Sequence, residues 1–434
     1  MNPLFRNDRP GAMPPSWYAA TAETPDLRPP LRGEVRADVA VVGAGYTGLW
    51  AALTLARRGM RVVVLDAHRA GFGASGRNGG QVGSGYNMGQ PWLEKRLGAD
   101  TARALWDLAE AGKRQLRDFC AAHAPDARYL PGVAHGAHSV AEADDDARAA
   151  DHLVRHYGYD QVDTLNRGAM QALVKSPSYM GGVLDRGAGH IHPLAYALAL
   201  AREAEGAGAV LHELSEVTRV ERGSPATVHT AQGRVVADHV ILAGNGYLPG
   251  IEAEVAARVA PINSFVCATE PLGDAWTDVL ARDIAVADSR FVVNYFRMTH
   301  DRRFLFGGRE SYGIGFPRDI RTALVARMTA LFPQLAGTTV THVWGGTLAI
   351  TTHRLPALQR LAPNIVSGSG FSGHGVALSG MAGRVMAEAT WGDAASFDTF
   401  ARLPLPRFPG GAALRAPLLT LAMTWFAMRD RLGL

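Results

Sequence analysis

Apolar residues near the start of the chain follow the order expected for a strand, a tight turn, a helix and a second strand. Residues 37–42 (ADVAVV) form a β-branched, mostly apolar run, which is typical of a buried parallel strand. Glycines follow at once, and residues 49–58 then form an Ala- and Leu-rich segment that ends at Gly59, a common way to end a helix. Residues 61–65 (RVVVL) predict the second strand. The pattern indicates an α/β unit with parallel strands.

Further elements of the same kind are expected later in the chain. Residues 235–243 form another buried-strand pattern, and residues 364–367 predict a strand that leads through a glycine-rich turn into a helix over 376–390. Residues 291–298 and 303–308 instead have the pattern of an antiparallel hairpin. The chain therefore combines a parallel α/β unit with a separate antiparallel sheet.

The glycines after the first strand complete a dinucleotide-binding fingerprint. Gly43 permits the tight turn, Gly45 lets the backbone approach a pyrophosphate, and Gly48 lets the helix pack close to the strand. Asp66 closes the second strand 23 positions after Gly43, where a carboxylate accepts hydrogen bonds from ribose hydroxyls and disfavours a 2′-phosphate. The residues of this predicted site are Gly43, Gly45, Tyr46, Thr47, Gly48 and Asp66.

A second GxGxxG sequence, at Gly368, Gly370 and Gly373, does not complete the same fingerprint. The acid at a suitable spacing is Glu388, but no second strand intervenes, so Glu388 lies in the predicted helix itself. We therefore do not interpret this turn as a nicotinamide site.

A glycine-dense loop follows the acidic residue of the first fingerprint. The loop contains one cation, Arg77, and its glycines let the backbone lie close to a phosphate, a ribitol chain and a flat ring. At this point the chain resembles the FAD-dependent amine oxidases of the D-amino-acid oxidase superfamily, and among them most closely the bacterial gamma-glutamylputrescine oxidases. The resemblance covers nearly the whole chain and rests on GFGASGRNGGQ at 71–81, GHIHPL at 189–194, LAGNGYL at 242–248, RLPALQRL at 354–361, SGHGV at 372–376, FPGG at 408–411 and RDRLG at 429–433.

The resemblance implies FAD as the cofactor and assigns its contacts by position. The loop after Asp66 is expected beside the pyrophosphate and the isoalloxazine, and Val217 beside the adenine. The turn at 371–376 is expected to face the flavin pyrimidine, where a helix dipole stabilises the negative charge that reduction brings. The implied contacts are Gly73, Ala74, Ser75, Arg77, Asn78, Gly79, Gly80, Gln81, Val217, Gly244, Gly346, Gly370, Phe371, Ser372, Gly373, His374, Gly375 and Val376.

These features together predict an α/β fold with two domains. We expect a Rossmann-type FAD-binding domain that is discontinuous in sequence and a substrate domain built on a mixed sheet. The predicted FAD-binding domain comprises residues 30–115, 187–249 and 341–434. The predicted substrate domain comprises residues 116–186 and 250–340.

An amine oxidase must hold its substrate as the neutral amine, because an ammonium has no lone pair to assist hydride loss. Burial against aromatic side chains lowers the amine pKa if no nearby carboxylate stabilises the ammonium. Tyr295 and Trp344 are candidates for such an aromatic pocket, with plain core packing as the alternative for each, and His374 is a third candidate. His190 and His192 are interpreted as structural, and no carboxylate joins these histidines at metal-ligand spacing, so no metal is expected.

Three departures from better-known relatives narrow the chemistry that the resemblance implies. Sarcosine-type enzymes place a carboxylate-binding lysine where this chain has Ala377, so an α-amino acid substrate is disfavoured. They attach flavin through a cysteine in the stretch matching 344–358, which has none here, so noncovalent FAD is expected. They also place a lysine near flavin N5, and none occurs in 303–308. Oxygen and a quinone both stay open as the electron acceptor.

The function predicted is FAD-dependent oxidation of a primary or ω-amino amine like gamma-glutamylputrescine, a reaction of polyamine catabolism. Hydride transfer to flavin N5 would give an imine, then an aldehyde and ammonia. The main alternative is a secondary-amine or cyclic imino-acid dehydrogenase on the same fold. A nicotinamide dehydrogenase and a non-catalytic flavoprotein subunit are the other candidates.

Composition adds limits on partners and compartment. A formal net charge of +4 does not indicate a nucleic-acid partner, although the sequence pI is near 9.2. Two cysteines, Cys120 and Cys267, are too few for a disulfide framework. The first residues lack the apolar core of an export signal. Because both observations fit a reducing compartment, a cytoplasmic enzyme is expected. The apolar run at 418–428 is too short for a membrane span. A helix lying on a membrane surface stays open there.

Overall fold

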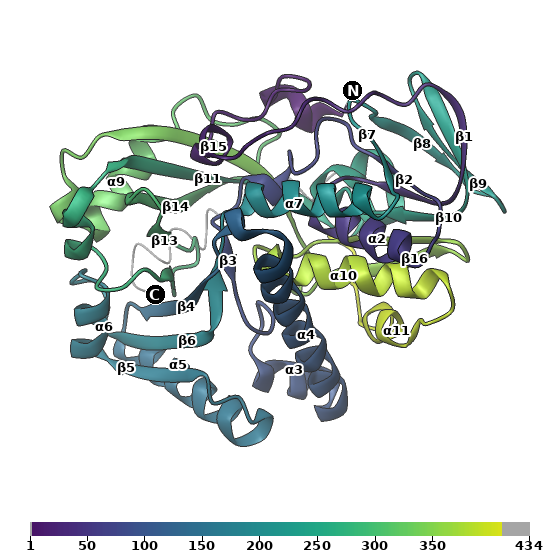
Figure 1. Cartoon of the computed structure of the whole chain (residues 1–434). Helices are drawn as coiled ribbons and strands as arrows, with labels where there is room; N and C mark the ends of the chain where they lie inside the picture. Colours follow the sequence, from purple (N-terminus) through teal and green to yellow (C-terminus); the bar gives the residue numbers. More distant parts are fainter. Residues whose placement is uncertain (1, 410–434) are drawn as a thin grey trace.

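The computed structural model describes residues 2–409, and in that range the strands form two β-sheets (Figure 1). The first sheet has the order β16-β17-β10-β1-β2-β7, with β9 joined to β10 and β8 to β9. Neighbouring strands from β17 to β7 are parallel. The strands are β1 (Gly33–Val42), β2 (Val62–Leu65), β7 (Val210–His212), β8 (Val217–Glu221), β9 (Ala226–Thr230), β10 (Gly233–Leu242), β16 (Ala357–Ala362) and β17 (Ile365–Ser369).

The apolar run at the carboxyl end of β1, residues 39–42, reflects burial on both faces of the strand. Val39 and Val41 belong to the hydrophobic cluster that includes the covering helices, whereas Ala40 and Val42 belong to the cluster on the other side. The predicted strand, helix and second strand are confirmed as β1, α2 (Tyr46–Arg57) and β2.

Four helices pack together on one side of the parallel sheet (Figure 1). They are α2, α4 (Ala99–His123), α7 (Pro193–Gly206) and α10 (Gly375–Thr390). A Cβ atom at Gly48 would lie 1.8 Å from the carbonyl oxygen of Gly43, so only glycine lets α2 sit this close to its turn. A Cβ atom at Gly383 would lie 2.1 Å from the carbonyl oxygen of Thr47, which explains the close approach of α10 to α2.

The second sheet has the order β15-β11-β14-β13-β12-β4-β6-β3, with β5 joined to β6. The predicted hairpin is confirmed, because β13 pairs antiparallel with β14, although the first strand begins at Tyr295 and not at 291. The strands are β3 (Gln81–Val82), β4 (Leu130–Ala137), β5 (Val162–Asn166), β6 (Gly181–His190), β11 (Ala260–Pro271), β12 (Ala285–Asp288), β13 (Tyr295–Met298), β14 (Arg303–Ser311) and β15 (Val340–Ile350).

The remaining helices are short or lie around the second sheet. They are α1 (Trp17–Thr21), α3 (Gln90–Leu97), α5 (Val140–His152), α6 (Arg167–Leu173), α8 (Ala253–Ala256), α9 (Arg321–Leu331) and α11 (Ala395–Ala401). From residue 2 to residue 409, none of the helices is long and apolar enough to cross a bilayer. The apolar run at 418–428 lies outside the described residues.

Strand pairing cuts across the predicted domain boundaries at two places. β3 and β15 fall in segments that the sequence analysis gives to the FAD-binding domain, yet both hydrogen-bond within the second sheet. β15 runs directly from the second sheet into β16 and β17 of the first sheet. The two sheets are therefore joined through a continuous stretch of chain, and the boundaries themselves stay a prediction.

Candidate active site

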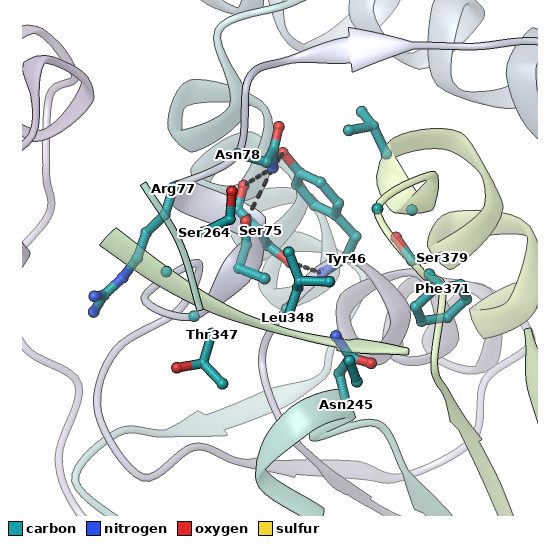
Figure 2. Close-up of a pocket in the computed structure, with 18 of the residues that line it drawn as sticks. Tyr46, Ser75, Arg77, Asn78, Asn245, Ser264, Thr347, Leu348, Phe371 and Ser379 are labelled. Atoms are coloured by element: carbon teal, nitrogen blue, oxygen red, sulfur yellow. Dashed lines mark hydrogen bonds between the residues drawn. The ribbon is translucent and has the colours of Figure 1, made fainter. Parts of the chain in front are cut away.

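A cavity of about 910 Å³ is lined by residues of both sheets. From the first sheet come the ends of β1 and β2 and the turn into α2. From the second sheet come side chains of β11, β13, β14 and β15. The turn before α10 forms a further wall. Figure 2 shows Tyr46, Ser75 and Asn78 facing this space, with Phe371 and Ser379 across it.

The first residues of α2 form an anion-binding wall of the cavity. Gly45 is the N-cap residue and offers no side chain to the helix amides. The N–H of Tyr46 donates to the Ser75 Oγ at 3.0 Å (Figure 2). Free N–H groups at the positive end of a helix dipole favour a phosphate oxygen. This wall therefore suits the pyrophosphate of a dinucleotide.

Asp66 lies at the end of β2 in the same cavity. Its carboxylate accepts the backbone N–H groups of Ala44 and His68, each at 2.8 Å, which fixes its orientation. Burial raises the pKa of Asp66 to about 6, because the enclosed charge lacks full solvation. Hydroxyl donors such as those of a ribose would supply the missing hydrogen bonds.

Asn78 stabilises the glycine-dense loop from within. Its Nδ2 donates to the carbonyl oxygens of Ala74 and Ser75, both at 3.0 Å, and its Oδ1 accepts the N–H of Gly80 at 2.8 Å. These bonds fold the loop back on itself, so its backbone forms part of the cavity wall.

Arg77 does not offer its charge to the cavity. Its guanidinium donates to the carbonyl oxygens of Phe72 (2.7 Å) and Gly345 (3.1 Å) and pairs with Asp8 at 2.9 Å. In Figure 2 the side chain extends away from the other labelled residues. The sequence analysis interprets Arg77 as the cation that wraps the cofactor. Arg77 lines the cavity, but its guanidinium is already paired with Asp8, so a cofactor contact of Arg77 stays a prediction.

His374 is the buried polar group of the turn before α10. Its Nε2 has no hydrogen-bond partner among the described residues, although the residue lines the cavity. Burial lowers the pKa of His374, so the imidazole is neutral near pH 7. A Cβ atom at Gly83 would lie 2.4 Å from the imidazole Cε1, so a glycine there makes room for the ring. An unpaired buried nitrogen in the wall is what a bound polar ligand would satisfy.

Most of the predicted cofactor residues line this one cavity. Three do not, and each is a glycine that shapes the wall from behind. Gly48 and Gly80 stand against backbone carbonyls, and Gly370 adopts φ +72°, which favours glycine. The lining residues are Gly43, Gly45, Tyr46, Thr47, Asp66, Gly73, Ala74, Ser75, Arg77, Asn78, Gly79, Gln81, Val217, Gly244, Gly346, Phe371, Ser372, Gly373, His374, Gly375 and Val376.

The two aromatic pocket candidates have different positions. Tyr295 lines the cavity, and its hydroxyl lies 3.2 Å from the Ser264 Oγ. Trp344 does not line it. Its side chain is buried in a cluster with Trp17 and Tyr18, and its Nε1 donates to the carbonyl oxygen of Arg77 at 2.9 Å. Of the two alternatives for Trp344, the structure supports core packing.

His190 and His192 lie outside the cavity lining. The Nδ1 of His192 accepts the N–H of Ala195 at 3.1 Å and so caps α7. Burial lowers the pKa of both imidazoles to about 3, which keeps them neutral. The contact of His192 is that of a structural residue, and within the described ranges no set of three His, Cys, Asp or Glu residues is arranged to hold a metal.

The N-terminal segment closes one side of the cavity, a contact that local patterns do not indicate. Asn2 and Phe5 line the cavity, and the Asn2 Nδ2 donates to the carbonyl oxygen of Tyr247 at 2.9 Å. The Phe5 ring stacks on Tyr247 at 4.8 Å and meets His68 edge-on at 4.6 Å. Asp8 then anchors the segment through Arg77. This wall lies beside the predicted adenine contact Val217.

We expect Phe5→Ala to raise the FAD dissociation constant about tenfold, because the lost aromatic stacking is worth roughly 0.5–1.5 kcal/mol and water gains access. Titrating the apoprotein with FAD, followed by flavin fluorescence, measures the change. The control is Trp92→Ala, which removes an aromatic side chain that is 37% exposed and lines no part of the cavity. Equal dissociation constants for the two variants would show that the segment does not retain the cofactor.

Several charged residues of the cavity wall are absent from the sequence prediction, among them Glu310 and Arg354. Glu310 is in β14, and Arg354 follows β15. The sequence analysis makes a lowered amine pKa depend on the absence of a nearby carboxylate. Glu310 is a carboxylate in the cavity wall, opposite Ser264 on β11.

The geometry is that of a dinucleotide-binding site, and the chain belongs to the family of FAD-dependent oxidoreductases whose model (DAO) matches residues 38–389. It is 40% identical to the "Probable oxidoreductase OrdL" of Rhizobium meliloti over 96% of this chain and 97% of that protein. It is also 40% identical to the "Gamma-glutamylputrescine oxidoreductase" of Escherichia coli over 96% of this chain and 98% of that one. Glycine oxidase from Geobacillus kaustophilus has the same fold, with a TM-score of 0.70, 24% identity, and coverage of 85% and 100% of the two chains.

Family membership identifies the cofactor as FAD and the protein as an enzyme. The structure fits that cofactor independently, through the N-terminus of α2, whose N-cap Gly45 has no side chain, the enclosed carboxylate of Asp66 and the unpaired nitrogen of His374. The resemblance found in the sequence is thus confirmed at the level of family, fold and cofactor.

Proposed function

We propose that this protein oxidises a primary amine on a polyamine-derived or ω-amino chain, with a substrate like gamma-glutamylputrescine. The observation that carries the proposal is the 40% identity to a gamma-glutamylputrescine oxidoreductase over 96% of the chain. When bound, FAD supplies the hydride acceptor, flavin N5, so that the amine becomes an imine, which water converts to an aldehyde and ammonia. Oxygen or a quinone is the final electron acceptor.

The chain's own contribution is to position the amine and to exclude water around it. Tyr295 packs over two glycines that leave room for its ring, since Cβ atoms at Gly79 and Gly307 would lie within 2.8 and 2.1 Å of it. The Tyr295 hydroxyl is held by Ser264, and Phe371 lines the same cavity. An enclosed wall of this kind disfavours an ammonium and so favours the neutral amine.

The turn before α10 supports an amine without an α-carboxylate. Ala377, in the first turn of α10, is apolar and buried, so it offers no cation to such a carboxylate. A charge-assisted hydrogen bond contributes roughly 1.5–3 kcal/mol, which corresponds to about ten- to a hundredfold in specificity. Glycine and sarcosine are therefore proposed to be poor substrates.

Anaerobic flavin bleaching against a panel of amines tests the proposal. We expect gamma-glutamylputrescine and related long-chain amines to reduce the flavin about ten- to a hundredfold faster, per unit concentration, than glycine or sarcosine. Proline in the panel tests the alternative of a cyclic imino-acid dehydrogenase. If sarcosine or proline is the best substrate, the proposed substrate class is wrong, and if nothing bleaches the flavin, a non-catalytic flavoprotein is favoured.

A further inference from the structure

Arg354 presents a cation to the cavity without a polar partner. Its guanidinium makes no hydrogen bond or ion pair with any residue in the described part of the chain, and its neighbour is the ring of Phe291, 5.9 Å from the guanidinium carbon. The Arg354 backbone has φ +64°, a conformation that costs energy for a non-glycine residue. Strained backbone with an unpaired cation in a cavity wall is typical of a ligand-binding residue.

Glu310 presents a carboxylate to the same cavity without a paired cation. Two other acids on the substrate side are each held by a histidine, with Asp288 2.8 Å from His138 and Asp146 2.9 Å from His135. Glu310 has no ion pair with any described residue, and its one side-chain hydrogen bond is from the Tyr312 hydroxyl, at 2.7 Å. The charge of Glu310 is thus available to a ligand.

The two charges belong to one region of the wall. Burial raises the pKa of Glu310, whereas the hydrogen bond from Tyr312 and the positive charges of Arg354 and Arg327 lower it. Burial and the neighbouring Glu310 raise the pKa of the Tyr312 hydroxyl, and Arg354 lowers it. In the strand register, Glu310 lies opposite Ser264, whose hydroxyl meets Tyr295, so the cluster adjoins the aromatic wall proposed to enclose the reacting amine.

We propose that Arg354 and Glu310 bind the far end of the substrate, and that this end is a zwitterionic α-amino acid head group. Arg354 would bind its carboxylate and Glu310 its ammonium, with the Tyr312 hydroxyl orienting Glu310. The inference rests on the proposed function, since it names what the amine substrate carries at its other end.

The reacting amine itself is a poor occupant for Glu310. A carboxylate beside an amine favours its protonated form and so raises its pKa, which opposes the neutral form that oxidation requires. A second ammonium that does not react has no such conflict. A free cation and an unpaired carboxylate in one wall complement a zwitterion better than they complement a ligand of a single charge.

Three substrates with the same reacting amine separate the contributions of the two charges. Gamma-glutamylputrescine carries both charges, N-glutarylputrescine carries only the carboxylate, and N-butyrylputrescine carries neither. Flavin reduction by each is measured with the wild type, Arg354→Met, Glu310→Gln and the control Arg318→Met. Arg318 is exposed and lies outside the cavity lining.

We expect Arg354→Met to lower kcat/KM about ten- to a hundredfold for the two substrates with a carboxylate and less than twofold for N-butyrylputrescine. Glu310→Gln should lower kcat/KM about tenfold for gamma-glutamylputrescine alone. Arg354→Lys should restore part of the loss, because it restores the charge without the planar fork. Equal losses for all three substrates, or no loss in either variant, would overturn the inference.

A nonreacting ligand keeps this test separate from the proposed function. Gamma-glutamylbutylamide has the zwitterionic head group but lacks the terminal amine, so its binding to the holoenzyme by calorimetry does not depend on catalysis. We expect binding to the wild type and to Arg318→Met, and at least tenfold weaker binding to Arg354→Met and Glu310→Gln. Absence of binding to the wild type would refute the site, whereas binding without oxidation of any amine would refute only the proposed function.

Discussion

Gly45→Val is expected to give a folded but colourless protein. The wild type should purify yellow, and acid precipitation should release that colour into the supernatant, because residues 344–358 contain no cysteine for covalent attachment. The Cβ of a residue at position 45 would lie 2.8 Å from the Ser75 Oγ, a side chain that can rotate, so the fold should tolerate the change. The branched side chain would occupy the wall that suits the pyrophosphate, so the FAD-to-protein ratio should fall from near one to near zero.

The matched control for this prediction is Gly206→Ala. Gly206 ends α7, and a Cβ atom there would meet nothing within 4 Å, so this variant should stay yellow. The absorbance ratio at 450 and 280 nm measures flavin content, and circular dichroism shows whether each variant is folded. Yellow Gly45→Val protein would contradict the assignment of the pyrophosphate wall, and colour that stays in the acid pellet would contradict noncovalent attachment.

The elements that the sequence predicted well are those whose signal is local. A strand segment that is buried on both faces must be apolar throughout, and residues 39–42 of β1 are therefore visible as an apolar run. The role of Gly48 could also be predicted, because the contact that excludes a side chain there is local: the carbonyl group of Gly43, five residues earlier. The family, the cofactor and most of the cavity wall follow from such segments.

The elements that the sequence analysis missed depend on contacts between residues far apart in the chain. Arg77 stands in a loop that suggests a cofactor cation, and only the folded chain shows that Asp8 already takes its charge. Phe5 reaches the cavity because Tyr247, more than 200 residues later, offers a stacking surface. No spacing rule connects these pairs, since each depends on how the N-terminal segment crosses the first sheet.

The substrate side was less predictable than the cofactor side for a related reason. Side chains of an antiparallel sheet alternate between faces, so the wall depends on the register with neighbouring strands. Glu310 faces the cavity opposite Ser264, and a register shift occurs between Phe265 and Val266 on the same strand. Trp344 had two plausible environments, and pairing with Val266 in a tightly packed cluster placed it in the core. The charged side chain of Glu310 in the cavity wall therefore could not be predicted from a stretch whose pattern is mainly aromatic.

The rate of flavin reduction at saturating amine is expected to rise tenfold per pH unit and then level off, with an apparent pKa below about 10, the value for a free alkylamine. Enclosure by Tyr295 and Phe371 disfavours the ammonium, which lowers the pKa of the bound amine. Burial raises the pKa of Tyr295, so its phenol stays protonated across this range. Burial lowers the pKa of His374, so its imidazole is already neutral and should not contribute the inflection.

Two variants identify the group that titrates, with stopped-flow reduction measured from pH 6 to 10. Tyr295→Ala should admit water to the cavity and move the inflection upward, toward the value of the free amine. His374→Gln should leave it within about 0.3 unit of the wild type, because a neutral side chain replaces a neutral one. If the inflection is instead unchanged in Tyr295→Ala and lost in His374→Gln, then His374 is the general base, and its unpaired Nε2 is the atom that receives the proton from the substrate.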